Sequence, residues 1–137
     1  MTEPPTVLVT GATDGLGRAV SVELARAGAT VLVHGRSLAR AEGAVAEIHE
    51  ASGSRRLRPY AADLASLAEV RALADRVTSQ EPRLDVLVNN AGIGGTALLA
   101  EMTDEQWSTV LDVTLTGTMR MTRAALQHMG ASGGGAI

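Results

Sequence analysis

A glycine-rich stretch, residues 10–17, is the feature that most limits how this chain can fold. The segment before it, residues 6–9, is short, β-branched and preceded by prolines, so it predicts a buried strand. Apolar residues recur after the stretch at the spacing of one helix face: Leu16, Val20, Leu24 and Ala27. Gly28 then follows, where a helix end favours a left-handed residue. The pattern predicts a strand, a glycine turn and a helix.

The start of a helix after such a turn can bind phosphate groups. Its first N–H groups have no partner within the helix, and the helix dipole adds about half a positive charge. A side chain at Gly11 or Gly17 would hold a diphosphate away from these donors, and Gly17 also lets the helix lie close to the strand. Because glycines also mark ordinary tight turns, the stretch alone is a weak signal of nucleotide binding.

Three further motifs follow in order along the chain. They are Asp63-Leu64, Asn89-Asn90-Ala91-Gly92 and residues 107–117. Together with Thr-Gly-x-x-x-Gly-x-Gly at residues 10–17, they resemble the short-chain dehydrogenase/reductase family, from about residue 6 to the last residue. The resemblance implies an α/β fold of the Rossmann type, a doubly wound parallel sheet in strand order 3-2-1-4 that ends before the fifth strand. Residues 1–137 are then a single, incomplete nucleotide-binding domain.

The end of the second predicted strand, residues 30–34, is the place that distinguishes NAD from NADP. Gly35 stands where an acidic residue would accept hydrogen bonds from the 2′-hydroxyl of NAD, and Arg36 follows it. A guanidinium pairs bidentately with a phosphate, so Arg36 favours NADP over NAD. Arg40, one helical turn further, is placed to assist. Asp14 either repels a nearby phosphate or orients Arg36.

The resemblance also implies which residues contact the cofactor. The set is Gly11, Thr13, Asp14, Gly15, Leu16, Gly17, Arg36, Asp63, Leu64, Asn90, Ala91 and Gly92. In the family the aspartate of this set accepts a hydrogen bond from the adenine amine, and the Asn-Ala-Gly segment lines the adenosine ribose and the middle of the cofactor. Asp63 has a second, compatible role open to it, as the cap of the helix that follows. Asn89 is interpreted as structural, since its amide can satisfy backbone groups where the sheet opens.

Capping residues predict the remaining helices. Ser37 is expected to cap a helix that ends before Gly53, with Ala41, Val45 and Ile48 on its buried face. Residues 55–60 predict a third strand, and their three arginines are typical of a soluble sheet edge.

A long helix is predicted to begin after Thr103, with Gln106 completing a capping box. Residues spaced three or four positions apart mark one face of this helix: Trp107, Val110, Leu111, Thr114, Thr118, Met121, Ala125 and Met129. In the resembled family the equivalent helix packs against the sheet on one side and a second subunit on the other. A homo-oligomer through residues 103–129 is therefore expected.

The proton-handling residues of the resembled family do not occur in this sequence. There a tyrosine exchanges a proton with the substrate oxygen, a lysine four residues later lowers the pKa of that tyrosine, and a serine positions the substrate. Here Tyr60 is the only tyrosine, and the chain has no lysine. Residues 133–137 look like the entry to the fifth strand, after which those residues would come. Thr114 occupies the position at which the resembled family has an asparagine in its long helix. Its hydroxyl is expected to bond to a carbonyl one turn earlier.

These patterns favour an NADP-dependent oxidoreductase that transfers a hydride between the nicotinamide and a small carbonyl or alcohol substrate. In this interpretation the chain is the cofactor-binding half, inactive alone. The alternative is a catalytically silent module that binds NADP or pairs with a complete relative.

Composition excludes several other classes. A formal net charge of −3 argues against a nucleic-acid partner, and without cysteine no thiolate metal site or disulfide can form. Three isolated histidines are interpreted as surface or packing residues rather than metal ligands: His34, His49 and His128. No apolar run approaches the roughly 18 residues of a membrane span, and no signal-peptide pattern is present. A cytoplasmic protein with no membrane partner is the expectation.

Overall fold

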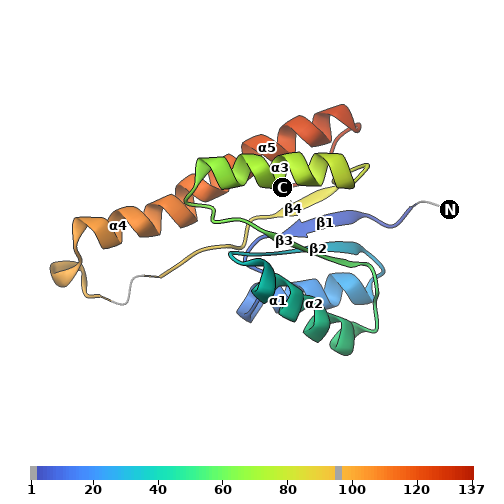
Figure 1. Ribbon diagram of the computed structural model, residues 1–137, viewed down its shortest axis with the longest axis horizontal. Helices are drawn as coiled ribbons and strands as arrows, with labels where there is room; N and C mark the ends of the chain where they lie inside the picture. Colours follow the sequence, from blue (N-terminus) through green and yellow to red (C-terminus); the bar gives the residue numbers. More distant parts are fainter. Residues whose placement is uncertain (1–2, 95–96) are drawn as a thin grey trace.

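The computed structural model describes residues 3–94 and 97–137. Its four-stranded parallel sheet has the order β3-β2-β1-β4, with helices packed on both faces (Figure 1). The strands are β1 (Thr6–Val9), β2 (Thr30–Gly35), β3 (Leu57–Ala61) and β4 (Val86–Val88). The helices are α1 (Gly15–Arg26), α2 (Leu38–Ser52), α3 (Leu67–Gln80), α4 (Asp104–Leu111) and α5 (Gly117–Ala131), with a 3-10 turn η1 (Leu99–Glu101) and a π-helical turn η2 (Asp112–Thr116). The predicted α/β class and the strand order 3-2-1-4 are confirmed.

The central strands are buried on both faces, as a parallel sheet covered by helices requires. Alternate side chains of β1 enter two separate cores: Leu8 packs with residues of α3 and α5, whereas Val7 and Val9 pack with residues of α1 and α2. All strand pairs run parallel, so their carboxyl ends meet at one edge of the sheet. Beyond β4, Ala136 forms a parallel bridge with Val86, which places the expected entry to a fifth strand beside β4.

The buried face of α1 differs from the predicted one. Its buried residues are small, namely Gly17, Ser21 and Ala25, whereas the side chain of Leu16 is 72% exposed. Small residues let the helix axis approach the sheet closely, and the Ser21 hydroxyl is satisfied by donating to the carbonyl of Gly17 at 2.8 Å. The close packing of α1 on the sheet therefore favours small residues over large apolar ones on its buried face. Gly28 adopts the predicted left-handed conformation, with φ +91°.

The capping predictions for α2 are confirmed and the one for α3 is wrong. The Ser37 hydroxyl accepts from the N–H of Arg40, and Gly53 ends α2 in the left-handed conformation. At α3 the cap is Ser66, whose side chain accepts from the N–H of Glu69. Asp63 lies too early to cap this helix, because it instead closes the turn that precedes it by accepting from the N–H of Ala65 at 2.9 Å.

The edge strand β3 contributes a buried polar cluster under the end of α3. The Tyr60 hydroxyl donates to a carboxylate oxygen of Glu81 at 2.7 Å, and Arg58 pairs with the other oxygen of Glu81. Glu81 is 2% exposed, so this pairing compensates a buried charge. Burial and the adjacent carboxylate raise the pKa of Tyr60 above its ordinary value. Tyr60 is therefore a structural residue, held in its protonated form.

The predicted long helix is present, but it is not regular. Its start is as predicted, with Thr103 and Gln106 forming the capping box. The π-helical turn η2 shifts the helical phase between α4 and α5. The stripe buried against the sheet holds Gly117, Met121, Ala125 and Met129, of which the last three were predicted, while no residue of α4 is buried.

The amino-terminal part of this helix projects beyond the sheet (Figure 1). Trp107, predicted on the packed face, is 51% exposed there. Among the described residues, no helix combines the length and apolar character needed to cross a lipid bilayer.

We expect Gly17→Ala to lower the free energy of unfolding by about 2 kcal/mol or more. A Cβ at this position would collide with the carbonyl oxygen of Gly11 and the side-chain amide of Asn90. Denaturant unfolding followed by circular dichroism measures the change. Gly43→Ala is the matched control, because Gly43 is also helical but exposed, with no described atom within 4 Å of the added Cβ, and should stabilise by about 0.5–1 kcal/mol. Equal stability of Gly17→Ala and the parent protein would contradict the close contact of Gly17 with Gly11 and Asn90.

Candidate nucleotide-binding cleft

A cleft of about 320 Å³ lies at the edge where the carboxyl ends of the strands meet. This volume lies at the lower end of the range for small-molecule sites, about 300–1,000 Å³. The structure brings almost all of the predicted contact residues to its walls: Gly11, Thr13, Asp14, Gly15, Leu16, Arg36, Asp63, Leu64, Asn90, Ala91 and Gly92. Gly17 is the exception, since it is buried behind the turn. Motifs that lie up to 80 residues apart in the sequence thus form one surface.

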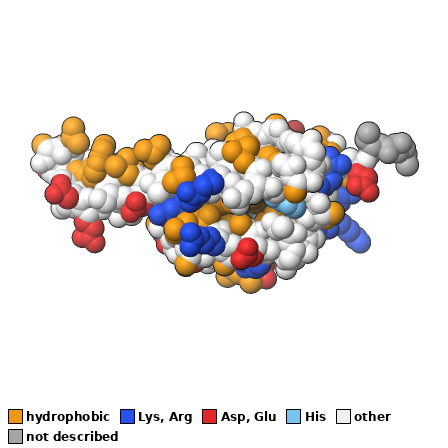
Figure 2. Space-filling model, turned by 90° about the horizontal axis from the view of Figure 1, so that it is seen from above, with side chains coloured by type: hydrophobic (Ala, Val, Ile, Leu, Met, Phe, Trp, Pro, Cys, Tyr) orange, Lys and Arg blue, Asp and Glu red, His pale blue; other side chains and the backbone are white. Residues whose placement is uncertain are grey.

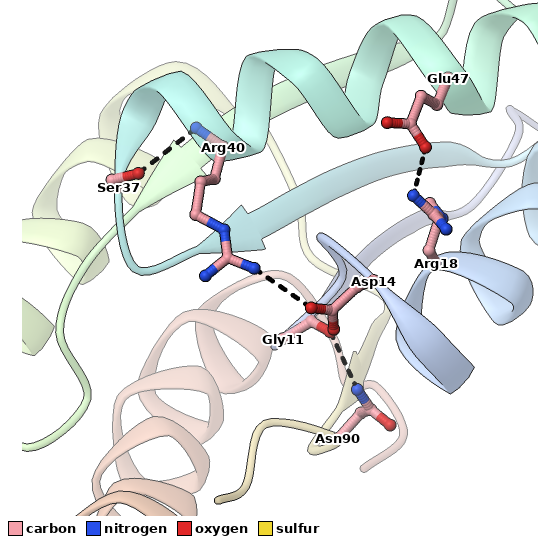
Figure 3. A network of polar contacts seen from close by, with 7 residues as sticks. All are labelled: Gly11, Asp14, Arg18, Ser37, Arg40, Glu47 and Asn90. Atoms are coloured by element: carbon pink, nitrogen blue, oxygen red, sulfur yellow. Dashed lines mark hydrogen bonds and ion pairs between the residues drawn. The ribbon is translucent and has the colours of Figure 1, made fainter.

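The glycine turn is hydrogen-bonded to the segment after β4. The Asn90 side chain donates to the carbonyl oxygens of Thr10 and Gly11, both at 3.1 Å. Figure 3 shows the bond to Gly11. Gly11 has φ +62°, and a Cβ there would lie 2.8 Å from Cα of Ala91. Packing within the chain therefore requires glycine at both positions, Gly11 and Gly17. The sequence predicted this for Gly17, whereas for Gly11 it suggested only the approach of a diphosphate.

The amino-terminal end of α1 opens into this cleft. Asp14 is its N-cap residue, but the Asp14 side chain makes no capping hydrogen bond, and the first turn contains no acidic residue. Gly15, which lines the cleft, has φ +51°, and no described atom lies within 4 Å of the position of its Cβ. The cleft thus has backbone N–H donors and open space beside them, which suits an anionic group.

His34 is a cleft residue whose role the sequence did not indicate. It is 3% exposed, and its Nδ1 accepts from the N–H of Gly11 at 3.2 Å. Its Nε2 lies 3.0 Å from the carbonyl oxygen of Ala62, so the neutral ring with its proton on Nε2 satisfies both contacts. Burial lowers the pKa of His34, which keeps the ring neutral. A polar residue at the end of an apolar strand was the available signal.

The charged residues of the cleft are Asp14 in the glycine turn, Arg36 after β2, Arg40 in the first turn of α2 and Asp63 after β3. Arg40 pairs with Asp14 at 3.1 Å, so the alternative in which Asp14 orients Arg36 is wrong (Figure 3). Arg36 is exposed and makes no ion pair with the described residues. At Gly35 a Cβ would collide with the methyl group of Thr13, so this position excludes an acidic side chain in the present packing.

Thr114 connects the long helix to Ile93, which lines the cleft. Its hydroxyl accepts from the N–H of Ile93 at 3.2 Å, instead of bonding to a carbonyl one turn earlier as predicted. Regular helical positions do follow the prediction, since Thr118 donates to the carbonyl of Thr114 at 2.7 Å. The difference arises because Thr114 lies in the π-helical turn η2. Nearby, the Asn89 side chain donates to the hydroxyl of Thr122 at 3.0 Å, so it holds a side chain of α5 and not the backbone groups predicted for it.

Because neutral His34 is buried, we expect the free energy of unfolding to decrease as the pH falls. The unfolded chain takes up a proton at its histidine below about pH 6.5 while the folded chain resists it, so stability is complete above that pH and declines towards the lowered pKa. One proton limits the slope to about 1.4 kcal/mol per pH unit. Denaturant titrations from about pH 7.5 to about pH 5.5 measure it.

His34→Gln should flatten this dependence, whereas His49→Gln, at the exposed end of α2, is the matched control and should keep the slope of the parent. An unchanged slope in His34→Gln would remove His34 as its cause.

The whole chain resembles one known family. Residues 5–137 match the short chain dehydrogenase family. The chain is 42% identical over 122 residues to an indene-carboxyl-CoA reductase of Mycobacterium tuberculosis, covering 89% of this chain and 46% of that protein. The chain spans about half the length of the curated relatives it matches.

Solved structures agree with this match. An actinorhodin polyketide ketoreductase with NADPH has a TM-score of 0.87 at 35% identity, over 96% of this chain and 51% of that one. A gluconate 5-dehydrogenase of Burkholderia cenocepacia, in complex with NADP and tartrate, has a TM-score of 0.87 at 30% identity, over 98% and 52%. With a matching family signature, fold and cleft, this chain belongs to the short chain dehydrogenase family.

Proposed function

We propose that this chain binds NADP and forms the cofactor half of an oxidoreductase that transfers a hydride between a nicotinamide ring and a small carbonyl or alcohol. The observation that carries the proposal is the single cleft that joins the open end of α1 to Arg36, with no acidic side chain at Gly35. An acidic group there would repel a 2′-phosphate, whereas a guanidinium attracts it. The relatives solved with NADP or NADPH support the same choice.

The cleft fits the parts of such a cofactor. The open space beside Gly15 and the first N–H groups of α1 suit the diphosphate. In this proposal Arg36 binds the 2′-phosphate, Asp63 the adenine amine, and residues 90–92 the ribose and the middle of the molecule; their common position on the cleft walls supports these roles. When bound, the nicotinamide supplies the hydride chemistry, and this chain's residues bind and orient it.

These 137 residues contain no pair that could handle the substrate proton. Tyr60 is held protonated in the cluster beneath α3, and the sequence has no lysine to lower the pKa of a tyrosine. We therefore propose that the polypeptide binds NADP without turning over a substrate. The second candidate, a silent module that pairs through its long helix, is favoured by the exposed apolar residues of that helix.

Titration of the full chain with NADPH and NADH, followed by nicotinamide fluorescence, tests the proposal. We expect NADPH to bind at least about tenfold more tightly, because a charge-assisted contact to the 2′-phosphate contributes about 1.5–3 kcal/mol. Arg36→Gln should lower this preference by about tenfold and leave NADH binding unchanged. Arg71→Gln removes the same charge from the exposed face of α3 and is the matched control.

Three results would contradict parts of this proposal. Equal binding of NADH and NADPH would remove the preference for NADP. Binding of neither nucleotide by a folded sample would remove the nucleotide site. Steady oxidation of NADPH with a panel of ketones and aldehydes would contradict the absence of turnover.

We further propose that the long helix joins two copies of the chain. Hydrophobic side chains gather over the projecting end of the molecule in Figure 2, where α4 lies. Along η2 and α5, Leu115 is 65% and Leu126 is 57% exposed, and such apolar surface favours burial in an interface.

Light scattering on a sizing column should therefore give the mass of a dimer. Leu126→Glu should shift the mass towards the monomer. Leu38→Glu changes an exposed leucine of α2 and should not alter the mass. A monomeric parent protein at micromolar concentration would rule out this interface.

A further inference from the structure

An ion pair spans the mouth of the cleft between the glycine turn and α2. Arg40 Nη2 lies 3.1 Å from Asp14 Oδ2, and both residues line the cleft (Figure 3). Arg40 is held in the first turn of α2, where its N–H donates to the Ser37 cap. Asp14 stands at the N-cap position of α1, yet its side chain turns to Arg40 instead of capping the helix. The Arg40 guanidinium that lines the cleft together with Arg36 is therefore already engaged by a carboxylate.

This pair is weak enough to be exchanged. The two side chains are 58% and 72% exposed, and exposed ion pairs contribute about 0–1 kcal/mol. A phosphate monoester carries about two negative charges and three acceptor oxygens, so it is a stronger partner for a guanidinium than one carboxylate. Once released, the Asp14 carboxylate can be hydrated where it stands, because it is mostly exposed.

We propose that Arg40 exchanges Asp14 for the 2′-phosphate of NADP, so that Asp14 competes with this phosphate and tunes the preference between NADP and NAD. The inference rests on the proposed function and adds to it. Arg36 has no ion pair to break among the described residues, whereas Arg40 must first leave Asp14. With NAD, which lacks the 2′-phosphate, the Asp14 to Arg40 pair stays intact. Any repulsion between Asp14 and the diphosphate affects both nucleotides alike, so the ratio of their affinities isolates the exchange.

The test is a double-mutant cycle on the full chain at low salt, where charge effects are least screened. NADPH and NADH are titrated into the parent protein, Asp14→Asn, Arg40→Gln and the double variant. Arg40→Gln should weaken NADPH binding by about tenfold and leave NADH unchanged. Asp14→Asn should strengthen NADPH binding by about threefold, because Arg40 no longer has to leave a carboxylate.

The double variant decides the mechanism. If Asp14 acts through Arg40, the gain from Asp14→Asn disappears when Arg40 is already glutamine. Adenosine 2′,5′-bisphosphate and 5′-AMP, used as competitors, should show the same pattern, since only the first carries the 2′-phosphate.

Arg18→Gln is the matched control. Arg18 pairs with Glu47 between α1 and α2 and lies outside the cleft lining, so removing its charge should leave the NADPH to NADH ratio unchanged (Figure 3). All substituted side chains are at least partly exposed, and circular dichroism verifies the fold of each variant.

Three outcomes overturn the inference in different ways. If Arg40→Gln keeps the NADPH to NADH ratio, Arg40 does not contact the phosphate, while the proposed function stands. If the gain from Asp14→Asn persists in the double variant, Asp14 acts by direct repulsion and there is no exchange. If the folded parent protein binds neither nucleotide, the proposed function fails and the inference fails with it.

Discussion

The missing side chain at Gly17 is the constraint on which this structure depends. It allows the first turn of α1 to pack directly on the carbonyl of Gly11 and the amide of Asn90. Because Asn90 in turn donates to Thr10 and Gly11, the turn after β1 and the segment after β4 become one rigid unit. Because the strands of the sheet run parallel, the carboxyl ends of β2 and β3 lie at the same edge of the sheet as this unit. The cleft exists because these backbones approach closely, so its shape follows from packing before any ligand is considered.

The chemistry of the cleft follows from how its charges are arranged. Buried His34 stays neutral, so the ring connects the glycine turn to the segment after β3 without adding a charge. The charges lie instead on Arg36, Arg40 and Asp14, which are exposed, and on Asp63, which is partly buried. An anion therefore meets backbone donors inside and guanidinium groups outside. Tyr60 and its carboxylate partner Glu81 belong to a separate, structural cluster.

Much of this arrangement was predictable from the sequence because the signals are local or ordered. The turn of residues 10–17, the cap at Ser37 and the capping box at Thr103 depend on neighbours within a few residues. The family resemblance of the ordered motifs implied that Asp63 and residues 90–92 would line the same site as the glycine turn, and all of them lie on the walls of the cleft. The strand order 3-2-1-4 followed from the same motifs through the family resemblance.

The sequence by itself determined the strands, the glycine turn and the capped helices from local periodicity, and its ordered motifs, through the family resemblance, indicated the strand order and most of the residues that line the cleft. Only the tertiary structure decided which face of α1 is buried, where the π-helical turn shifts the long helix, and that His34 bridges two segments. It also decided that Asp14 pairs with Arg40 and not with Arg36. The physical reason is distance: close packing and ion pairing change over a few ångströms, and spacing along the chain does not specify separations that small across different elements.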